Sequence, residues 1–193
     1  MKIETRLGDK GLYITDCVDQ EHLDKIFELE STLRPIEQIH FFRTSFNLSD
    51  NELNTYLIKN INSAILEYLT DSNKDRSEYI ARNSYAMSHW MLNKRLNPHI
   101  DTIKYDHEDT HTPRSIINAL LYLTDDYDGG EIFFPELDIA IKPKAGSVVV
   151  FDSDLEHGVN EVKRGTRKTL ESNLFSIYSE DIEEVKAHGW RSI

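Results

Sequence analysis

Short apolar stretches separated by turn residues fill the second half of the chain, and they constrain its fold more than any other feature. The longest, residues 115–123, is almost continuously apolar, as expected for a strand covered on both faces. Glycine and proline at 128–130 and 143–146 supply turns between stretches. A succession of such strands predicts a sandwich or a barrel. The predicted strands are 11–16 in the first half, and 85–92, 115–123, 131–134, 137–141, 147–151 and 169–178 in the second.

Helical patterns appear mainly in the first half. One helix is predicted to begin after Asp19, which is expected to cap it. A second helix is predicted over residues 49–69, with Ser49 as its N-cap and Glu52 completing a capping box. Both carry an apolar stripe and are expected to pack against a sheet. A short surface helix is predicted at 180–187.

The length of 193 residues and the hydrophobic fraction of 39% predict one globular domain with a sizeable core. Within the domain 1–193 we expect a supporting region of helices and strands at 1–80. The main β core is expected at 81–179 and a C-terminal tail at 180–193.

Charge and cysteine content bear on partners and location. The formal net charge of −12 argues against non-specific binding to nucleic acid. No apolar stretch is long enough to span a bilayer, and the N-terminus lacks the apolar region of a secretory signal. The single cysteine, Cys17, excludes an intrachain disulfide. These features predict a cytoplasmic protein without a membrane partner.

The most informative polar pattern is His99-Ile-Asp101 followed much later by His157. Two imidazoles and one carboxylate are the ligands of non-haem Fe(II) centres that activate oxygen, and they leave coordination positions open. Residues two apart in a strand point to the same side, so His99 and Asp101 can reach one metal ion. His157 must come from a different strand. The Asn97-Pro98 pair is predicted to end the strand that precedes His99.

A His-x-Asp pair also occurs by chance, and a rival cluster exists in a polar stretch between two predicted strands. On a helix its two histidines would share one face, but the stretch lacks a helical apolar pattern. We therefore interpret residues 102–114 as a mobile lid with solvated histidines. The rival residues are Asp106, His107, Glu108, Asp109 and His111. Ordinary surface histidines are expected at His22, His40 and His188.

The segment from Trp90 to Phe175 resembles the catalytic core of the Fe(II)/2-oxoglutarate dioxygenases, most closely the prolyl 4-hydroxylase branch. The resemblance implies that His99, Asp101 and His157 are the iron ligands. It also implies a mainly β (α+β) fold, a double-stranded β-helix or cupin-like jelly roll with N-terminal helices packed against the sheet. The matching pieces are Asn97–Asp101, Ala119–Asp126, Gly129–Pro135, Lys142–Ser147, Val150–Ser153, His157 and Gly165–Arg167.

The same resemblance places Arg167 opposite the distal carboxylate of 2-oxoglutarate, where many prolyl hydroxylases have lysine. Arginine can hold a carboxylate with two parallel hydrogen bonds. The adjacent alternative is Lys168, but alternation along the strand predicts that it points to the other face. Tyr122 corresponds to a family tyrosine whose hydroxyl can contact the same carboxylate. A purely structural role for Tyr122, as a core aromatic, is an equally good interpretation.

Three positions depart from the family pattern. Trp90 stands where tyrosine is frequent, and an indole N–H can donate a hydrogen bond but not accept one. Asn93 replaces a frequent glycine, but asparagine tolerates a left-handed backbone, so the turn can be kept. Ile132 replaces a common threonine. These departures bear on substrate identity rather than on the predicted ligands.

The resemblance implies a dioxygenase that uses Fe(II), 2-oxoglutarate and O₂, with ascorbate as a candidate reductant. It would hydroxylate a C–H bond, that of a peptidyl proline being the first expectation, and convert 2-oxoglutarate to succinate. The expected partner is thus a protein or peptide that contains proline. One alternative is an AlkB-type nucleic-acid demethylase, which places a second arginine further along the last strands, whereas residues 169–175 contain none. Another is a non-catalytic cupin-like module that binds a metal or a sugar.

Overall fold

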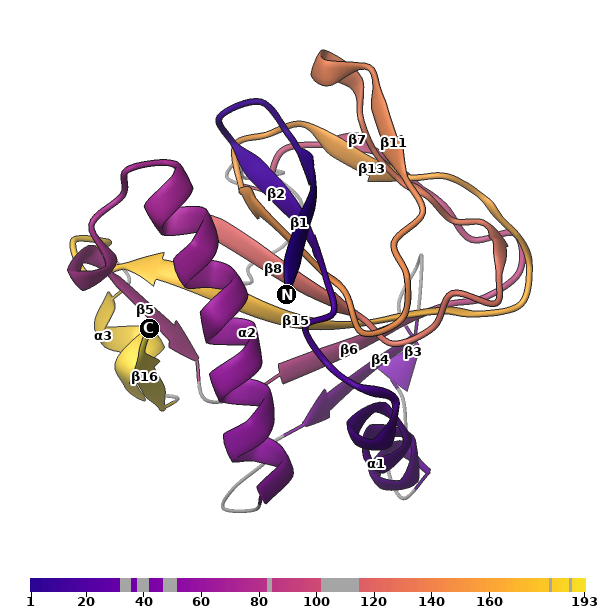
Figure 1. The fold of residues 1–193 in the computed structure, drawn as a ribbon, viewed down its shortest axis with the longest axis horizontal. Coiled ribbons are helices and arrows are strands. Elements are labelled where there is room, and N and C mark those ends of the chain that lie inside the picture. The colour runs from indigo at the N-terminus through magenta and orange to yellow at the C-terminus, as the bar shows by residue number, and fades with distance from the viewer. Residues whose placement is uncertain are drawn as a thin grey trace.

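A large antiparallel sheet forms the centre of the fold (Figure 1). The computed structural model describes residues 1–31, 36–37, 42–46, 52–82, 85–101, 115–180, 182–187 and 189–193. Within these residues the strand order is β1-β2-β12-β8-β15-β6-β4-β3, and β5 pairs with both β15 and β16. The strands are β1 (Lys2–Arg6), β2 (Gly11–Thr15), β3 (Ile36–Glu37), β4 (Phe42–Phe46), β5 (Tyr79–Arg82), β6 (Tyr85–Trp90), β8 (Ile117–Tyr122), β12 (Val148–Asp152), β15 (Arg167–Ser176) and β16 (Trp190–Ser192).

A smaller four-stranded antiparallel sheet lies against one face of the large sheet, in the order β11-β10-β13-β7. A third, two-stranded sheet pairs β14 with β9. The two facing sheets confirm the expected mainly β jelly roll. Their strands are β7 (Leu96–His99), β9 (Asp128–Gly129), β10 (Ile132–Phe134), β11 (Ile139–Ile141), β13 (His157–Val159) and β14 (Val162–Arg164).

Helices α1 (Gln20–Glu30) and α2 (Glu52–Asp71) cover the opposite face of the large sheet, as predicted (Figure 1). The apolar stripe of α2 packs against strands β2, β8 and β12. Helix α3 (Ile182–Ala187) is short and packs near β15 and β16. Two 3₁₀ turns complete the regular structure, η1 (Arg76–Glu78) and η2 (Pro135–Leu137). None of the described helices has the length and apolar character needed to cross a membrane.

Strand β8 shows why the run 115–123 is apolar on both faces. Ala119 and Leu121 pack in the core under the helices, whereas Leu120 and Tyr122 face the core between the two sheets. Successive residues of a strand point to opposite faces, so a strand covered on both sides needs no polar alternation. The core between the sheets positions the candidate site.

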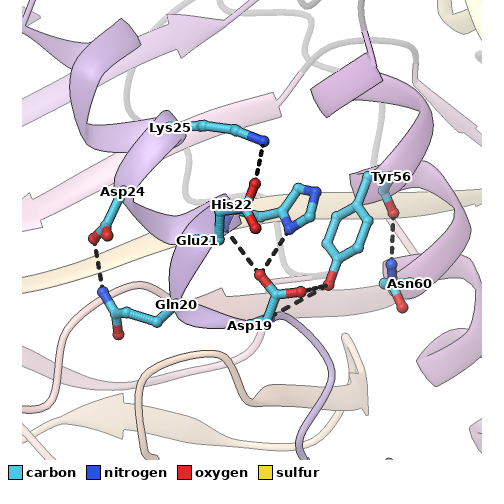
Figure 2. Close-up of polar contacts among 8 residues, drawn as sticks. All are labelled: Asp19, Gln20, Glu21, His22, Asp24, Lys25, Tyr56 and Asn60. Carbon is cyan, nitrogen blue, oxygen red and sulfur yellow. Dashed lines mark hydrogen bonds and ion pairs between the residues drawn. The ribbon is translucent and has the colours of Figure 1, made fainter.

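Asp19 caps α1 as predicted, and it also ties α1 to α2 (Figure 2). Its carboxylate accepts hydrogen bonds from the backbone N–H of His22 at 3.0 Å and from the hydroxyl of Tyr56 at 2.9 Å. The His22 ring stacks on Tyr56 with ring centroids 3.4 Å apart. These contacts lower the pKa of Asp19 to about 2, mainly through the side-chain hydrogen bond with His22. His22 is therefore a contact between helices, and the expectation of an ordinary surface histidine is wrong.

Several predicted boundaries need correction. Asn97 and Pro98 do not end a strand but lie inside β7. β7 is the edge strand of the small sheet, and an edge position tolerates a proline without an N–H. Leu137 belongs to the 3₁₀ turn η2, which begins at Pro135, so β11 starts only at Ile139.

Other differences extend the predicted strands. The last long strand begins at Arg167, two residues before the predicted start, and part of the predicted turn at 128–130 pairs as β9. Strands β1, β3, β4, β14 and β16 were not predicted, whereas the strand predicted at 11–16 is present as β2. Ser49, the predicted N-cap of α2, lies outside the described residues, and α2 begins at Glu52. The division of the chain at residues 80 and 179 stays a prediction.

Candidate metal centre and cosubstrate pocket

His99, Asp101 and His157 converge at one end of the small sheet. His99 ends β7 and His157 begins β13, and the two histidines are direct partners across the antiparallel pair. Nε2 of His99 lies 3.1 Å from Oδ1 of Asp101, and Nε2 of His157 lies 3.6 Å from Oδ2. One ligand atom from each residue falls within 4.8 Å of the other two. This spacing allows all three side chains to contact a single ion.

Asp101 reaches the group differently from the prediction, because β7 ends at His99 and Asp101 lies in the following turn. The backbone N–H of Asp101 donates to the carbonyl oxygen of Ser153 at 3.0 Å. Ser153 directly follows β12, so the large sheet holds Asp101 in place. The candidate metal site is therefore formed by residues that are anchored on both sheets.

Both histidine rings are oriented by backbone carbonyls. Nδ1 of His99 lies 3.1 Å from the carbonyl oxygen of Asn97, and Nδ1 of His157 lies 2.9 Å from that of Leu155. A carbonyl only accepts, so each Nδ1 carries a proton, and in the neutral ring Nε2 keeps the lone pair that can bind a metal. Metal-binding histidines are oriented by this kind of contact in general. The donor set fits a divalent iron ion.

Burial and mutual contact shift the pKa values of the three groups. Burial is the largest single effect and opposes protonation of His99, but the hydrogen bond from the protonated ring to Asp101, the charge of Asp101 and the backbone contacts together outweigh it and raise the pKa. Burial lowers the pKa of His157, although the nearby Asp101 opposes the shift. Burial would raise the pKa of Asp101, but His99 and the other neighbours lower it. An ionised carboxylate and a neutral imidazole are the forms that bind metals.

Aromatic rings wall the site. The ring of Phe151 meets His157 edge-on at a centroid distance of 4.6 Å, and Phe134 lies 6.4 Å from it. Both phenylalanines are fully buried between the sheets. An apolar wall keeps water away and strengthens electrostatic contacts nearby.

Arg167 lies on the same interior face and is only 1% exposed. Its Nη2 donates to the hydroxyl of Tyr122 at 2.7 Å, and its guanidinium lies over the rings of Trp90 and Tyr122. Its Nε finds no acceptor among the described residues, and no carboxylate pairs with it there. A buried, unpaired guanidinium is costly, so this pocket is suited to a bound anion.

The Tyr122 hydroxyl adds a second donor to this pocket. It accepts from Arg167, so its own proton is free, and no described residue accepts that proton. Burial raises the pKa of Tyr122 and keeps the hydroxyl protonated. A guanidinium and a hydroxyl donor side by side suit a carboxylate ligand.

Lys168 points to the opposite face, as predicted. Its Nζ lies 2.9 Å from both carboxylate oxygens of Glu30, and it sits over the ring of Phe27 in α1. Lys168 is thus part of the contact between β15 and α1. This geometry removes it as an alternative to Arg167 in the pocket.

Two polar residues of this region escaped the sequence analysis. His89, beside Trp90 on β6, is buried, and its Nδ1 lies 3.3 Å from Glu30. Asn118 is buried on β8 and donates to Asp101. The one signal for Asn118 was a polar residue inside an apolar run. His40, His188 and the rival cluster with His107 and His111 lie outside the described residues.

The family comparison covers the core of this site. Residues 85–175 match the model of the 2OG-Fe(II) oxygenase superfamily. Over 57 residues, 26% of this chain, the sequence is 49% identical to prolyl 3-hydroxylase 2 of Mus musculus. That match spans only 8% of the length of the mouse protein. The superfamily uses Fe(II), 2-oxoglutarate and O₂.

Solved structures share the fold at low sequence identity. The viral collagen prolyl hydroxylase vCPH from Paramecium Bursaria Chlorella virus-1, solved with 2-oxoglutarate, has a TM-score of 0.68 and 18% identity. The aligned part is 88% of this chain and 97% of the vCPH chain. HygX from Streptomyces hygroscopicus, solved with nickel, 2-oxoglutarate and hygromycin B, has a TM-score of 0.64 and 12% identity. The aligned part is 95% of this chain and 92% of HygX.

These similarities confirm the resemblance to Fe(II)/2-oxoglutarate dioxygenases of the prolyl hydroxylase type. The curated relatives are prolyl 3-hydroxylases, whereas the sequence motifs resemble the prolyl 4-hydroxylase branch. The match to the 2OG-Fe(II) oxygenase superfamily spans residues 85–175, which include His99, Asp101, His157 and Arg167.

Proposed function

We propose that this enzyme hydroxylates a C–H bond while it decarboxylates 2-oxoglutarate. One atom of O₂ enters the product as hydroxyl and the other enters succinate, with release of CO₂. The observation that carries the proposal is a buried arginine without an anionic partner among the described residues. Its charge acts on His157, which belongs to the group of two histidines and an aspartate that could hold one metal ion.

In this proposal His99, Asp101 and His157 hold Fe(II), each through one donor atom. The iron, when bound, supplies the activation of O₂. The carbonyls of Asn97 and Leu155 fix the two rings with Nε2 toward the ion. Three protein ligands leave three positions for a chelating cosubstrate and O₂.

Arg167 and Tyr122 bind the distal carboxylate of 2-oxoglutarate. The guanidinium supplies the positive charge, and the Tyr122 hydroxyl supplies a second hydrogen bond. The guanidinium lies over the rings of Trp90 and Tyr122, and these cation–π contacts hold it in place. Phe134 and Phe151 exclude water from the space beside His157. The protein thereby orients the cosubstrate and leaves the oxygen chemistry to the metal.

The substrate we propose is a proline in a protein or peptide. Support comes from relatives named as prolyl 3-hydroxylases and from the fold shared with a collagen prolyl hydroxylase. The net charge of −12 favours a neutral or basic peptide. HygX has the same fold with hygromycin B bound, so the fold alone does not select a peptide.

The test incubates the protein with Fe(II), 2-oxoglutarate, ascorbate and a panel of proline-containing peptides, with free proline included. We expect succinate release that needs all cofactors, together with a mass increase of about 16 on one substrate, as the insertion of one oxygen atom requires. Succinate release that is absent under every condition would refute the proposed activity. Demethylation of a methylated oligonucleotide without peptide oxidation would reassign the substrate class.

The proposed location is the cytoplasm. The chain has one cysteine, Cys17, and its thiol is buried in the core under the helices. Proteins with few cysteines and no disulfide suit a reducing compartment.

A further inference from the structure

We propose that Asn118 is a positioning residue that makes Asp101 bind the metal through a single oxygen. The inference rests on the proposed function, because it concerns the metal site formed by His99, Asp101 and His157. It assigns a role to a side chain that belongs neither to the ligand set nor to the cosubstrate pocket.

The contact between the two side chains is short and partly buried. Nδ2 of Asn118 donates to Oδ2 of Asp101 at 2.5 Å, and Asn118 is only 4% exposed. A hydrogen bond to an ionised acceptor is shorter and stronger than a neutral one. Asn118 comes from the middle strands of the large sheet, where β12 and β15 flank β8 on either side. The donor therefore has a rigid support.

A second hydrogen bond fixes the amide of Asn118. The Ser115 hydroxyl donates to Oδ1 of Asn118 at 3.0 Å and also lies 3.3 Å from the Ser153 hydroxyl. With its oxygen occupied in this way, the amide can present only its NH₂ group to Asp101. An aspartate at 118 would lack the donor, and a leucine would lack both groups. The position requires a side chain with a donor and an acceptor on one carbon.

The backbone of Ser153 also holds Asp101 in place. Its carbonyl oxygen accepts the N–H of Asp101 at 3.0 Å, and its own N–H donates to Ile116. Asp101 is thus held at its backbone by Ser153 and at its carboxylate by Asn118. Rotation of the carboxylate about its last bond is restricted.

The two oxygens of Asp101 then have different tasks. Oδ1 lies 3.1 Å from Nε2 of His99 and has no bond from Asn118. Oδ2 lies 3.6 Å from Nε2 of His157, but it already accepts the hydrogen bond from Nδ2 of Asn118. Oδ1 is the better placed ligand, and Oδ2 is held back from chelating the same ion. A carboxylate that bound through both oxygens would occupy a position needed for cosubstrate or O₂.

The test titrates Co(II) into the metal-free protein and follows visible absorption, which reports both affinity and coordination number. The first variant, Asn118→Leu, keeps the approximate size of the side chain and removes both hydrogen bonds. We expect Co(II) binding weaker by about 10- to 100-fold, as for other residues that orient a ligand from outside the metal shell. The spectrum is also expected to change, because a freed carboxylate can bind through two oxygens.

Asn173→Ala is the matched control. Asn173 is the direct partner of Asn118 on β15 and shares its face of the sheet. We expect the wild-type affinity and spectrum in this variant. Should Asn118→Leu fail to fold, Ser115→Ala removes the support of the amide, and about tenfold weaker binding is expected.

The outcomes separate the two proposals. Wild-type protein that binds no Co(II) at these residues would refute the metal site itself. Wild-type binding with an unchanged affinity and spectrum in a folded Asn118→Leu variant would refute the role of Asn118 alone. If Asn118→Leu does not fold, the same result in Ser115→Ala would refute it.

Discussion

Replacement of Arg167 by methionine separates a binding role from a structural one. The variant keeps a long side chain in the core and removes the charge. If the arginine balanced an internal carboxylate, its loss would leave a buried unpaired charge and cost about 3–5 kcal/mol of unfolding free energy. The described residues contain no such carboxylate. A smaller change in stability is therefore expected.

The magnitude follows from opposing contributions. The unsatisfied Nε of Arg167 carries a penalty of about 1–3 kcal/mol in the free protein. Its stacking over Trp90 and Tyr122 returns roughly 0.5–2 kcal/mol. Arg167→Met should thus leave the unfolding free energy of the ligand-free protein within about 1–2 kcal/mol of wild type, in either direction.

The effect on 2-oxoglutarate should be much larger. Loss of one partner from a buried charge pair costs about 2–5 kcal/mol of binding free energy. This corresponds to affinity weaker by about 30-fold to about 4,000-fold. Trp90 lies against the guanidinium, so its fluorescence offers a direct readout of binding, with succinate release as a second assay.

Lys168→Met is the control, because Lys168 neighbours Arg167 in sequence and contacts Glu30 on the other face. It should leave 2-oxoglutarate affinity unchanged. Urea unfolding gives the stability of both variants. A loss above about 3 kcal/mol in Arg167→Met, with unchanged affinity for 2-oxoglutarate, would refute the reasoning and make Arg167 a structural residue.

Three further predictions concern other residues. His157→Ala should abolish iron-dependent succinate release and retain a folded circular dichroism spectrum; retained turnover would remove His157 from the ligand set. Tyr122→Phe should weaken 2-oxoglutarate binding by about 1 kcal/mol, roughly fivefold in KM, because one hydrogen bond is lost. Burial raises the pKa of Cys17 to about 11, so the native thiol should resist iodoacetamide at pH 8 and react after unfolding. A raised thiol pKa stabilises the fold at pH values below the unfolded pKa, and this contribution should be lost as pH rises toward 11. Rapid alkylation of the folded protein at pH 8 would contradict the buried position of Cys17.

Local periodicity predicted the parts of the fold that depend on neighbouring residues. The two-residue repeat of β15 placed Arg167 and Lys168 on opposite faces, and the structure agrees. The left-handed backbone of Asn93, with φ of 64°, was expected from the tolerance of asparagine for that conformation. The apolar run of β8 correctly indicated a strand with two covered faces.

Contacts between residues that are distant in the sequence determine the features that the sequence analysis did not predict. Asp101 is fixed by the carbonyl of Ser153 and the amide of Asn118, and both residues are distant in sequence. His22 stacks on Tyr56 because two helices meet, which no local pattern indicates. The place of Pro98 inside a strand depended on β7 being an edge strand. Such features follow from which strands and helices become neighbours.

The position of His99 on an edge strand has a thermodynamic consequence. Two residue pairs, His157 with His99 and Val159 with Leu96, define the register of β7 on β13. An ion shared by His99 and His157 would act as one more link across this seam. Binding of the ion and pairing of β7 with β13 would then stabilise each other. Tighter binding of the ion should slow amide hydrogen exchange in residues 96–99, and a weaker pairing of β7 should speed release of the ion.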